Sequence, residues 1–416
     1  MTDGARSSRA PAWLGRDLRL IVAGRALRSV TLGYLNVIVP IYLARMGYSA
    51  VRVGAVFTAG ALGSMALTGG VGLLADRFGR KPLLVALALL TAASGLGFAL
   101  GRRYIVLLVA AAIGTMGRGG GAGAGGAFGP YFPAEQALIA EHAGNAHRTS
   151  AFGLLALVGV LGAAVGSLVA TLPTLLHDAA GVGVLTGDRA LFLLTAAIGV
   201  MMAVVVLPVT ERPRTPRPRG APRLGTNTSR LLPRFLLTNA TNGLAVGMLG
   251  PVLVYWFHVR YGASSAALGA LYFIANLAAA PSNVVAPALA RRMGAVRAVV
   301  STRLVAVVLL AAMALMPAFW MAAVLFLLRT QVNTLSNPIR QSFMMGVVDE
   351  ADRSTAAGLS NLPLQALSGA GPAIAGQLMQ SVWLDLPLEL AAALQGVNAA
   401  LYWAFFRNER PPEERR

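Results

Sequence analysis

The chain repeatedly runs for about twenty residues or more with hardly a charged side chain. An α-helix needs about 20 mostly apolar residues to cross the hydrocarbon core of a bilayer. Twelve runs meet this requirement, so we predict an all-α membrane protein with twelve transmembrane helices. The predicted spans are 18–44, 52–74, 82–100, 104–127, 150–172, 189–209, 233–257, 265–289, 296–316, 319–339, 355–378 and 388–406.

The composition agrees with a membrane protein. Hydrophobic residues make up 56% of the chain and charged residues 12%, whereas soluble domains carry about 25% charged residues. The basic segment 1–17 leads into an apolar run that is too long for the core of a signal peptide. We therefore expect 1–17 to be a cytoplasmic tail. The chain has no cysteine, which excludes disulfides and thiol chemistry.

Positive charge is distributed unevenly between the two sides of the predicted membrane. With twelve spans, both termini and the central loop share one side, and most of the arginine and lysine lies there. The positive-inside rule then places both termini in the cytoplasm. The net charge of +19 therefore reflects orientation in the cell membrane, with some attraction to anionic lipid, and no nucleic-acid partner is expected.

A segment rich in proline and arginine divides the predicted helices into two sets of six. Its composition, at 210–232, cannot support a packed core and is typical of an extended linker. We predict a cytoplasmic linker there, between an N-terminal bundle at 18–209 and a C-terminal bundle at 233–406. Residues 407–416 would form a cytoplasmic tail.

The two halves also resemble each other in sequence. Residues 47–60 align with 262–275 at an offset of 215, and residues 133–153 align with 338–358 at an offset of 205. Two like-oriented sets of six helices predict parallel repeats that meet at a central cleft. In transporters, such an arrangement allows one bundle to rock against the other.

The loop between the second and third spans is short and densely charged. It reads GLLADRFGRK over 72–81, and a degenerate copy at 287–299 has Arg291 in the place of the aspartate. The motif, its copy and the repeat together resemble the major facilitator superfamily, whose fold consists of two parallel six-helix bundles. The residues that match its gating motif are Gly72, Asp76, Arg77, Gly79, Arg80 and Lys81.

The resemblance implies a role for the acid in this loop. In the family, Asp76 would meet the start of the eleventh helix and pair with arginines such as Arg353. This contact would hold the two bundles together on the cytoplasmic side while the outside is open. A helix N-terminus stabilises a carboxylate by about 0.3–1 kcal/mol. The alternative, that the bases at 77–81 only follow the positive-inside rule, leaves the acid unexplained.

Polar side chains recur along several predicted spans, some of them on one helical face. Because a charge at the centre of a membrane helix costs about 2.5–3.5 kcal/mol, we predict that they line a substrate pathway. These residues are Arg25, Arg28, Asn36, Arg118, Asn239, Asn242, Asn276, Arg329, Asn333, Asn361 and Gln365. The alternative is that the asparagines hold helices together and that Arg25 reaches lipid headgroups. Arg303 is assigned to the headgroups.

No acidic residue occupies the middle of a predicted span. Glu135, at the inner end of the fourth span, is the one acid that could titrate during transport, but its position favours an ordinary helix-end residue. Drug antiporters of the resembled family carry a glycine pattern in the fifth helix. Gly153, Gly162 and Gly166 match it, whereas Ser167 replaces its proline. Uniport and symport therefore stay open beside antiport, and so does coupling to a proton or another ion.

These features predict a monomeric, multi-pass plasma-membrane transporter that works by alternating access. Its arginine-rich interior favours export of small neutral or anionic organic compounds. An importer or symporter of a metabolite anion is one alternative, and a non-transporting sensor or a lipid flippase of the same fold is another. An enzyme is disfavoured because the spans contain no cluster of His, Asp and Glu suited to catalysis. No metal or cofactor is expected.

Overall fold

The computed structural model describes residues 15–114, 129–142, 144–211, 225–349 and 352–409, and leaves out some side chains within these ranges, including those of 72–77. The described residues form fourteen helices and no strand. The helices of the first half are α1 (Arg16–Arg45), α2 (Ala50–Phe78), α3 (Arg80–Leu100), α4 (Tyr104–Gly114), α5 (Tyr131–His142), α6 (Gly144–Val169), α7 (Leu172–Ala180) and α8 (Val184–Val206). The helices of the second half are α9 (Thr226–Tyr261), α10 (Ser265–Met293), α11 (Ala295–Ala314), α12 (Phe319–Val347), α13 (Arg353–Ser381) and α14 (Leu386–Phe406).

The helix count agrees with twelve membrane crossings. Two helices, α4 and α5, take the place of the predicted span 104–127, and α7 is a short additional helix. The Tyr104 hydroxyl at the start of α4 donates to the Arg52 carbonyl oxygen, while His142 at the end of α5 lies 3.2 Å from the Asp17 carboxylate. The chain therefore passes from one end of the bundle to the other between these contacts, and the prediction of a twelve-helix fold is confirmed.

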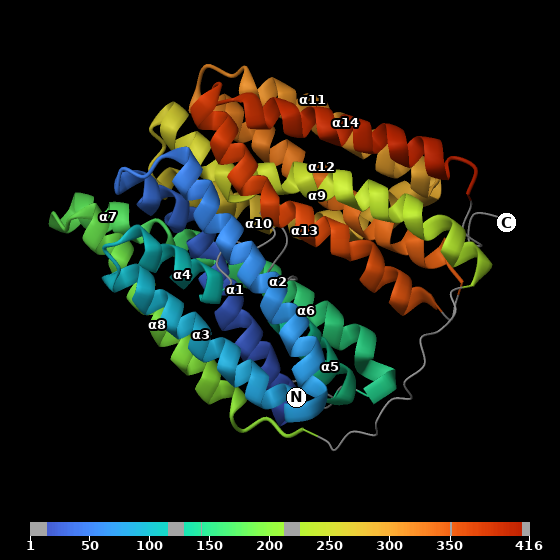
Figure 1. Cartoon of the computed structure of the whole chain (residues 1–416), viewed down its shortest axis with the longest axis horizontal. Coiled ribbons are helices and arrows are strands. Elements are labelled where there is room, and N and C mark those ends of the chain that lie inside the picture. The colour runs from blue at the N-terminus through green and yellow to red at the C-terminus, as the bar shows by residue number, and fades with distance from the viewer. Residues whose placement is uncertain (1–14, 115–128, 143, 212–224, 350–351, 410–416) are drawn as a thin grey trace, which may run out of the picture.

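The helices form two groups that follow the order of the chain. Figure 1 shows α1–α8 in blue to green and α9–α14 in yellow to red, and the two groups diverge toward the end where α1 begins and α14 ends. Large apolar side chains such as Leu96, Val200 and Trp320 are exposed on the outer helices. A surface of this kind suits a bilayer, whose lipid tails are as apolar as the side chains themselves.

Glycine allows the helices of each half to approach closely. In the first half, a Cβ atom at Gly33 of α1 would lie 2.9 Å from the Cα of Gly166 in α6. In the second half, a Cβ at Gly247 of α9 would lie 2.7 Å from the Cα of Ser368 in α13. Small residues at helix crossings give membrane helices their van der Waals contact, because no hydrophobic effect drives them together.

An ion pair at the end opposite the termini occurs in both halves. Arg45 at the end of α1 donates to both carboxylate oxygens of Asp188 near the start of α8, at 3.0 and 2.8 Å. In the second half, Arg260 near the end of α9 pairs with Asp385, which precedes α14. The two arginines are 215 positions apart, which is the offset of the sequence repeat. The first and last long helices of each half are thus tied together in the same way.

Helix α9 begins at Thr226, inside the segment 210–232 that the sequence predicted to be a linker. Its first turn is capped from the loop after α12, because Asp349 accepts hydrogen bonds from the backbone N–H and the hydroxyl of Thr228. These hydrogen bonds lower the pKa of the Asp349 carboxyl. A carboxylate supplied from a distant loop satisfies the free N–H groups of a helix start, and no local pattern reveals it.

The Arg45–Asp188 pair allows a first prediction about stability. Asp188 is fully buried, so Arg45→Met leaves its charge uncompensated and should lower the free energy of unfolding by about 3 kcal/mol. The double variant Arg45→Met, Asp188→Leu should recover most of this loss, because an apolar pair carries no desolvation cost. Thermal unfolding of the purified protein measures both. The exposed Arg102→Met is the control, and equal unfolding temperatures for Arg45→Met and the control would contradict the prediction.

Candidate functional site

Two arginines of α1 share one carboxylate of α5 inside the first half. Glu135 Oε2 accepts from Arg28 Nη2 at 2.9 Å and from Arg25 Nη1 at 3.3 Å. The arginines lie three residues apart, so they project from the same face of α1. All three side chains are almost fully buried, with 2%, 5% and 5% of the surface of Arg25, Arg28 and Glu135 exposed. The cluster therefore holds two positive charges and one negative charge away from solvent.

Tyr131 supports this cluster from one turn earlier in α5. The centre of its ring lies 4.8 Å from the Arg28 guanidinium carbon, a cation–π contact. Its hydroxyl lies 2.9 Å from the Oγ1 of Thr91 in α3. Because Thr91 donates its own proton to the Leu87 carbonyl, the Tyr131 hydroxyl is the donor between the two. Helices α1, α3 and α5 are thus joined around the Arg28 side chain.

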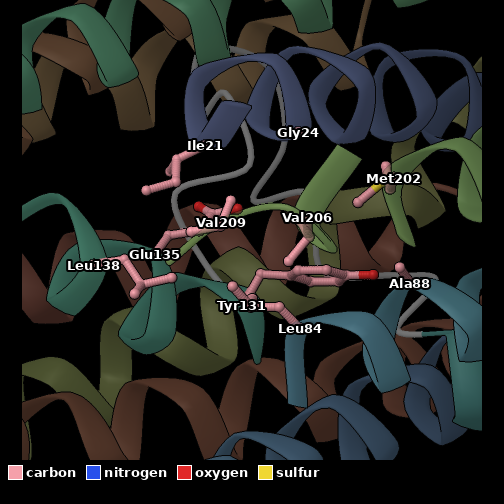
Figure 2. A pocket seen from close by; sticks show the side chains of 10 residues that line it. All are labelled: Ile21, Gly24, Leu84, Ala88, Tyr131, Glu135, Leu138, Met202, Val206 and Val209. Carbon is pink, nitrogen blue, oxygen red and sulfur yellow. The ribbon is translucent and has the colours of Figure 1, made fainter. Parts of the chain in front are cut away.

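Two small cavities flank Tyr131. The first, lined by Glu135, Ile21 and Met202 among others, has a volume of about 20 Å³, and Figure 2 shows the Tyr131 ring lying along it with the hydroxyl pointing toward Ala88. The second, of about the same volume, is lined by Arg28 and Thr91. A volume of this size holds about one water molecule. The cluster is therefore in contact with two spaces that each hold about one water molecule.

The second half contains a buried arginine of a different kind. Arg329 of α12 is 7% exposed, and the described part of the chain offers it no hydrogen bond or ion pair. Its neighbour is Tyr272 of α10, which interacts with the guanidinium electrostatically and packs against Phe326, one turn before Arg329 in α12. Arg329 is therefore a positive charge placed near the middle of a membrane helix without a counter-charge among the described residues.

The predicted asparagines have several different roles. Asn239 donates to the Ser360 carbonyl at 2.7 Å, and Asn242 accepts from Arg303 at 2.8 Å, so both join helices within the second half. Asn276 of α10 donates to Ser167 of α6 at 3.3 Å and therefore lies at the contact between the two halves.

The remaining predicted pathway residues are half-buried or lie outside the described residues. Asn36 and Asn333 are half-buried, as are Asn361 and Gln365 in α13. Arg118 lies outside the described residues. Their part in a substrate pathway stays a prediction.

The described part of the charged loop shows why its glycine is needed. Gly79 has a φ of +88°, and a Cβ there would lie 2.9 Å from a carboxylate oxygen of Glu211. Glu211 accepts from the backbone N–H groups of Arg80 and Lys81 at 2.9 and 3.2 Å, which caps the start of α3. No local sequence pattern indicated the role of Glu211, which lies in the chain segment after α8.

The gating contact predicted for this loop falls outside the described side chains. Gly72, Asp76 and Arg77 belong to α2, and Arg353 begins α13, but their side chains lie outside the described ones. The contact between Asp76 and the start of α13 therefore stays a prediction.

Two interpretations of charged residues were wrong. Arg303 does not reach lipid headgroups, since it is 3% exposed and donates to Asn242 in the interior of the second half. It lies eight residues after the start of α11, which is about 12 Å along the helix. This depth can be counted from the sequence, and it could have indicated that Arg303 is buried. Glu135 is not an ordinary helix-end residue, because it is buried between Arg25 and Arg28.

Comparison with known proteins identifies the class to which this fold and site belong. The family model of the Major Facilitator Superfamily matches residues 21–372 and 235–416. The chain therefore belongs to the major facilitator superfamily, and it is a membrane transporter rather than an enzyme.

Individual relatives are distant. The uncharacterized membrane protein YJR124C of Saccharomyces cerevisiae is 23% identical in an alignment 415 positions long that covers 91% of each chain. Among solved structures, the nucleoside transporter NupG has a TM-score of 0.72 at 14% identity, covering 94% of this chain and 100% of its own. A D-xylose–proton symporter has a TM-score of 0.71 at 15% identity, covering 93% and 97%. At these identities the structural likeness shows the fold alone.

The shared carboxylate generates the second prediction. Glu135→Gln leaves two buried guanidinium groups facing a neutral amide, and we expect the free energy of unfolding to fall by about 3 kcal/mol. Thermal unfolding of the purified protein is the measurement. Glu389→Gln removes an exposed acid from α14 and should change stability little. If the Glu135 variant unfolds at the wild-type temperature, the ion pairs do not hold α1 and α5 together.

Proposed function

We propose that this transporter is a secondary active carrier that works by alternating access and exports small organic compounds, preferentially anions, across the plasma membrane. The observation that carries the proposal is Arg329, a buried guanidinium without an acidic partner in the described part of the chain. A charge in a membrane helix is expensive and is retained where it meets a ligand or water. An anion is the ligand that would offset this charge.

The electrostatics of the second half support this substrate class. Arg329 places a buried positive charge there without an acidic partner among the described residues. A cationic substrate entering between the halves would be repelled by it. A carboxylate or phosphate group, by contrast, matches the planar guanidinium with two parallel hydrogen bonds.

The contacts between the halves support alternating access. A Cβ at Gly54 near the start of α2 would overlap the Pro372 carbonyl oxygen in α13, and a Cβ at Gly376 would overlap that of Ala50. At a second contact between the halves, a Cβ at Gly269 of α10 would lie 2.6 Å from the Ser167 carbonyl oxygen in α6. These contacts lie toward the end opposite the termini. With both termini placed in the cytoplasm, they close the outer side of the carrier.

The opposite state needs a contact at the cytoplasmic end. We assign this role to the charged loop, with Asp76 at the start of α13 beside Arg353. During each transport cycle, the glycine contacts on the outer side and the Asp76 contact on the inner side would then form and break in turn. Coupling to a proton or another ion supplies the driving force.

The substrate class is tested with Arg329→Gln in transport assays. Cells or vesicles loaded with a panel of labelled mono- and dicarboxylates should release them. The variant should reduce this release about tenfold or more, which is the effect of losing one hydrogen bond to a charged group. The exposed Arg103→Gln is the control. Net accumulation instead of release would assign import of an anion in place of export. Transport restricted to cations such as quaternary ammonium compounds would contradict the proposal.

Alternating access is tested at Gly54. Gly54→Val places a side chain against the α13 backbone, so it should prevent closure of the outer side and shift the carrier toward the outward-open state. The chain has no cysteine, so a single Ala61→Cys, at a position 4% exposed, reports the change without further substitutions. We expect an external, membrane-impermeant maleimide to label it several-fold faster in the Gly54→Val background, and transport to fall.

The matched control for this test lies in the same helix. A Cβ at Gly69 of α2 meets no atom within 4 Å, so Gly69→Val should leave both labelling and transport unchanged. Unaltered labelling of Ala61→Cys with Gly54→Val would show that the close approach of α2 and α13 does not seal the outer side.

A further inference from the structure

The sequence repeat places an arginine in the second half where the first half has its buried acid. At the offset of 205, Pro133 aligns with Pro338 and Gln136 aligns with Gln341. Glu135 therefore corresponds to Arg340 of α12. At the position where the first half has a carboxylate that balances two arginines, the second half has another positive charge.

Arg340 faces a buried polar group within the second half. Arg303 of α11 is 3% exposed and Tyr402 of α14 is 1% exposed. Arg340 is close enough to both side chains to interact with them electrostatically. The position of Tyr402 is fixed by its ring contact with Phe343, at 5.9 Å, one turn after Arg340. Helices α11, α12 and α14 thus bring two guanidinium groups and a phenol together.

Hydrogen-bond donors in this group lack acceptors. Arg303 uses one terminal nitrogen to donate to Asn242 at 2.8 Å. Its Nε, and the hydroxyl oxygen of Tyr402, are buried and have no hydrogen-bond partner in the described part of the chain. A buried donor without an acceptor costs about 1–3 kcal/mol, and more when it is charged. Two independent side chains therefore direct unsatisfied donors into the same region.

The described carboxylates that directly follow α12 and α14 are engaged elsewhere. Asp349 caps α9 at Thr228, and Asp352 accepts from the backbone N–H of Gly225. Glu409 pairs with Arg230 and Arg234. The described residues thus provide no ion pair for Arg303 or Arg340.

We propose that a small inorganic anion, of the size and charge of chloride, binds between Arg303, Arg340 and Tyr402. It supplies the negative charge that Glu135 supplies in the first half. The two guanidinium groups and the phenol O–H donate to it. The side chains of Phe343 and Phe406, which contact the Tyr402 ring, are fully buried, so the group lies in an apolar surrounding.

The site is separate from the proposed substrate pathway. Arg340 lies eleven residues after Arg329 in α12, which is about 16 Å along the helix. It lies seven residues before the end of α12 at Val347, or about 10 Å from the side that carries the termini. The anion would therefore enter from the cytoplasm, and its binding does not depend on which substrate is transported or in which direction.

The test compares chloride with gluconate, a much larger organic anion. Purified protein is transferred to sodium gluconate and titrated with sodium chloride at constant ionic strength, and the midpoint of thermal unfolding is followed by tryptophan fluorescence. A ligand that binds only the folded state stabilises it in a saturable manner. We expect chloride to raise the midpoint by several degrees, and no such shift from chloride would overturn the proposal.

The decisive variant restores the acid of the first half. Arg340→Glu should pair with Arg303 as Glu135 pairs with Arg25 and Arg28, so the protein should unfold at the same temperature with and without chloride. The exposed Arg407→Glu, just after α14, makes the same charge change and should keep the chloride dependence. A full chloride response in Arg340→Glu would contradict the site.

A milder variant covers the case in which Arg340→Glu does not fold. Tyr402→Phe keeps the ring and removes one donor, and it should raise the chloride concentration for half-maximal stabilisation about tenfold, the value of one hydrogen bond to a charged group. An unchanged half-maximal concentration would exclude Tyr402 as a ligand and overturn the proposed geometry.

Discussion

A guanidinium group in an apolar interior needs a negative charge or a ligand, and this requirement governs the arrangement of the first half. Glu135 meets it for Arg25 and Arg28, and Asp188 meets it for Arg45. Each of these contacts joins helices that are distant in sequence, namely α1 with α5 and α1 with α8. The same charges that make the interior costly therefore fix the first helix within its bundle.

The contacts between the two halves are of a weaker type. They include hydrogen bonds between neutral groups, such as Thr174 to Ser265 at 2.7 Å and the Ala373 N–H to Thr58 at 3.1 Å. A neutral hydrogen bond contributes about 1 kcal/mol, whereas breaking a buried ion pair costs about 3–5 kcal/mol. Strong contacts inside each half and weak contacts between them allow the halves to separate as units, which is what a rocking carrier requires.

Much of the fold could be predicted because its main features are local in sequence. The lengths of the apolar runs indicated twelve crossings, and the repeat indicated two like-oriented halves. The additional helix α7 and the early start of α9 were missed, because α7 is a short helix in a loop and α9 is capped by Asp349 from a distant loop. Helix boundaries that depend on tertiary contacts are not encoded in local composition.

The site was harder to predict, since the sequence shows how deep a charge lies but not which way it faces. The apolar residues of α11 do not gather on one face, so periodicity gave no indication that Arg303 points to Asn242. Glu135 meets Arg28 across 107 positions of sequence, and no spacing rule connects them. The sequence singled out Arg25 and Arg28 as unusual, but their partner follows from the packing of α1 against α5.

The repeat is preserved in its framework and altered in its interior. Arg45 and Arg260 occupy equivalent positions and pair with Asp188 and Asp385 in the same way. At the level of Glu135, however, the second half has Arg340. A symmetric framework lets two bundles move about a common axis, but identical interiors would bind a ligand equally from both sides. Unequal interiors give the two halves different electrostatic fields. A charged ligand can therefore interact differently with the carrier in its two states. Such a difference is required for any ligand to shift the equilibrium between the two states.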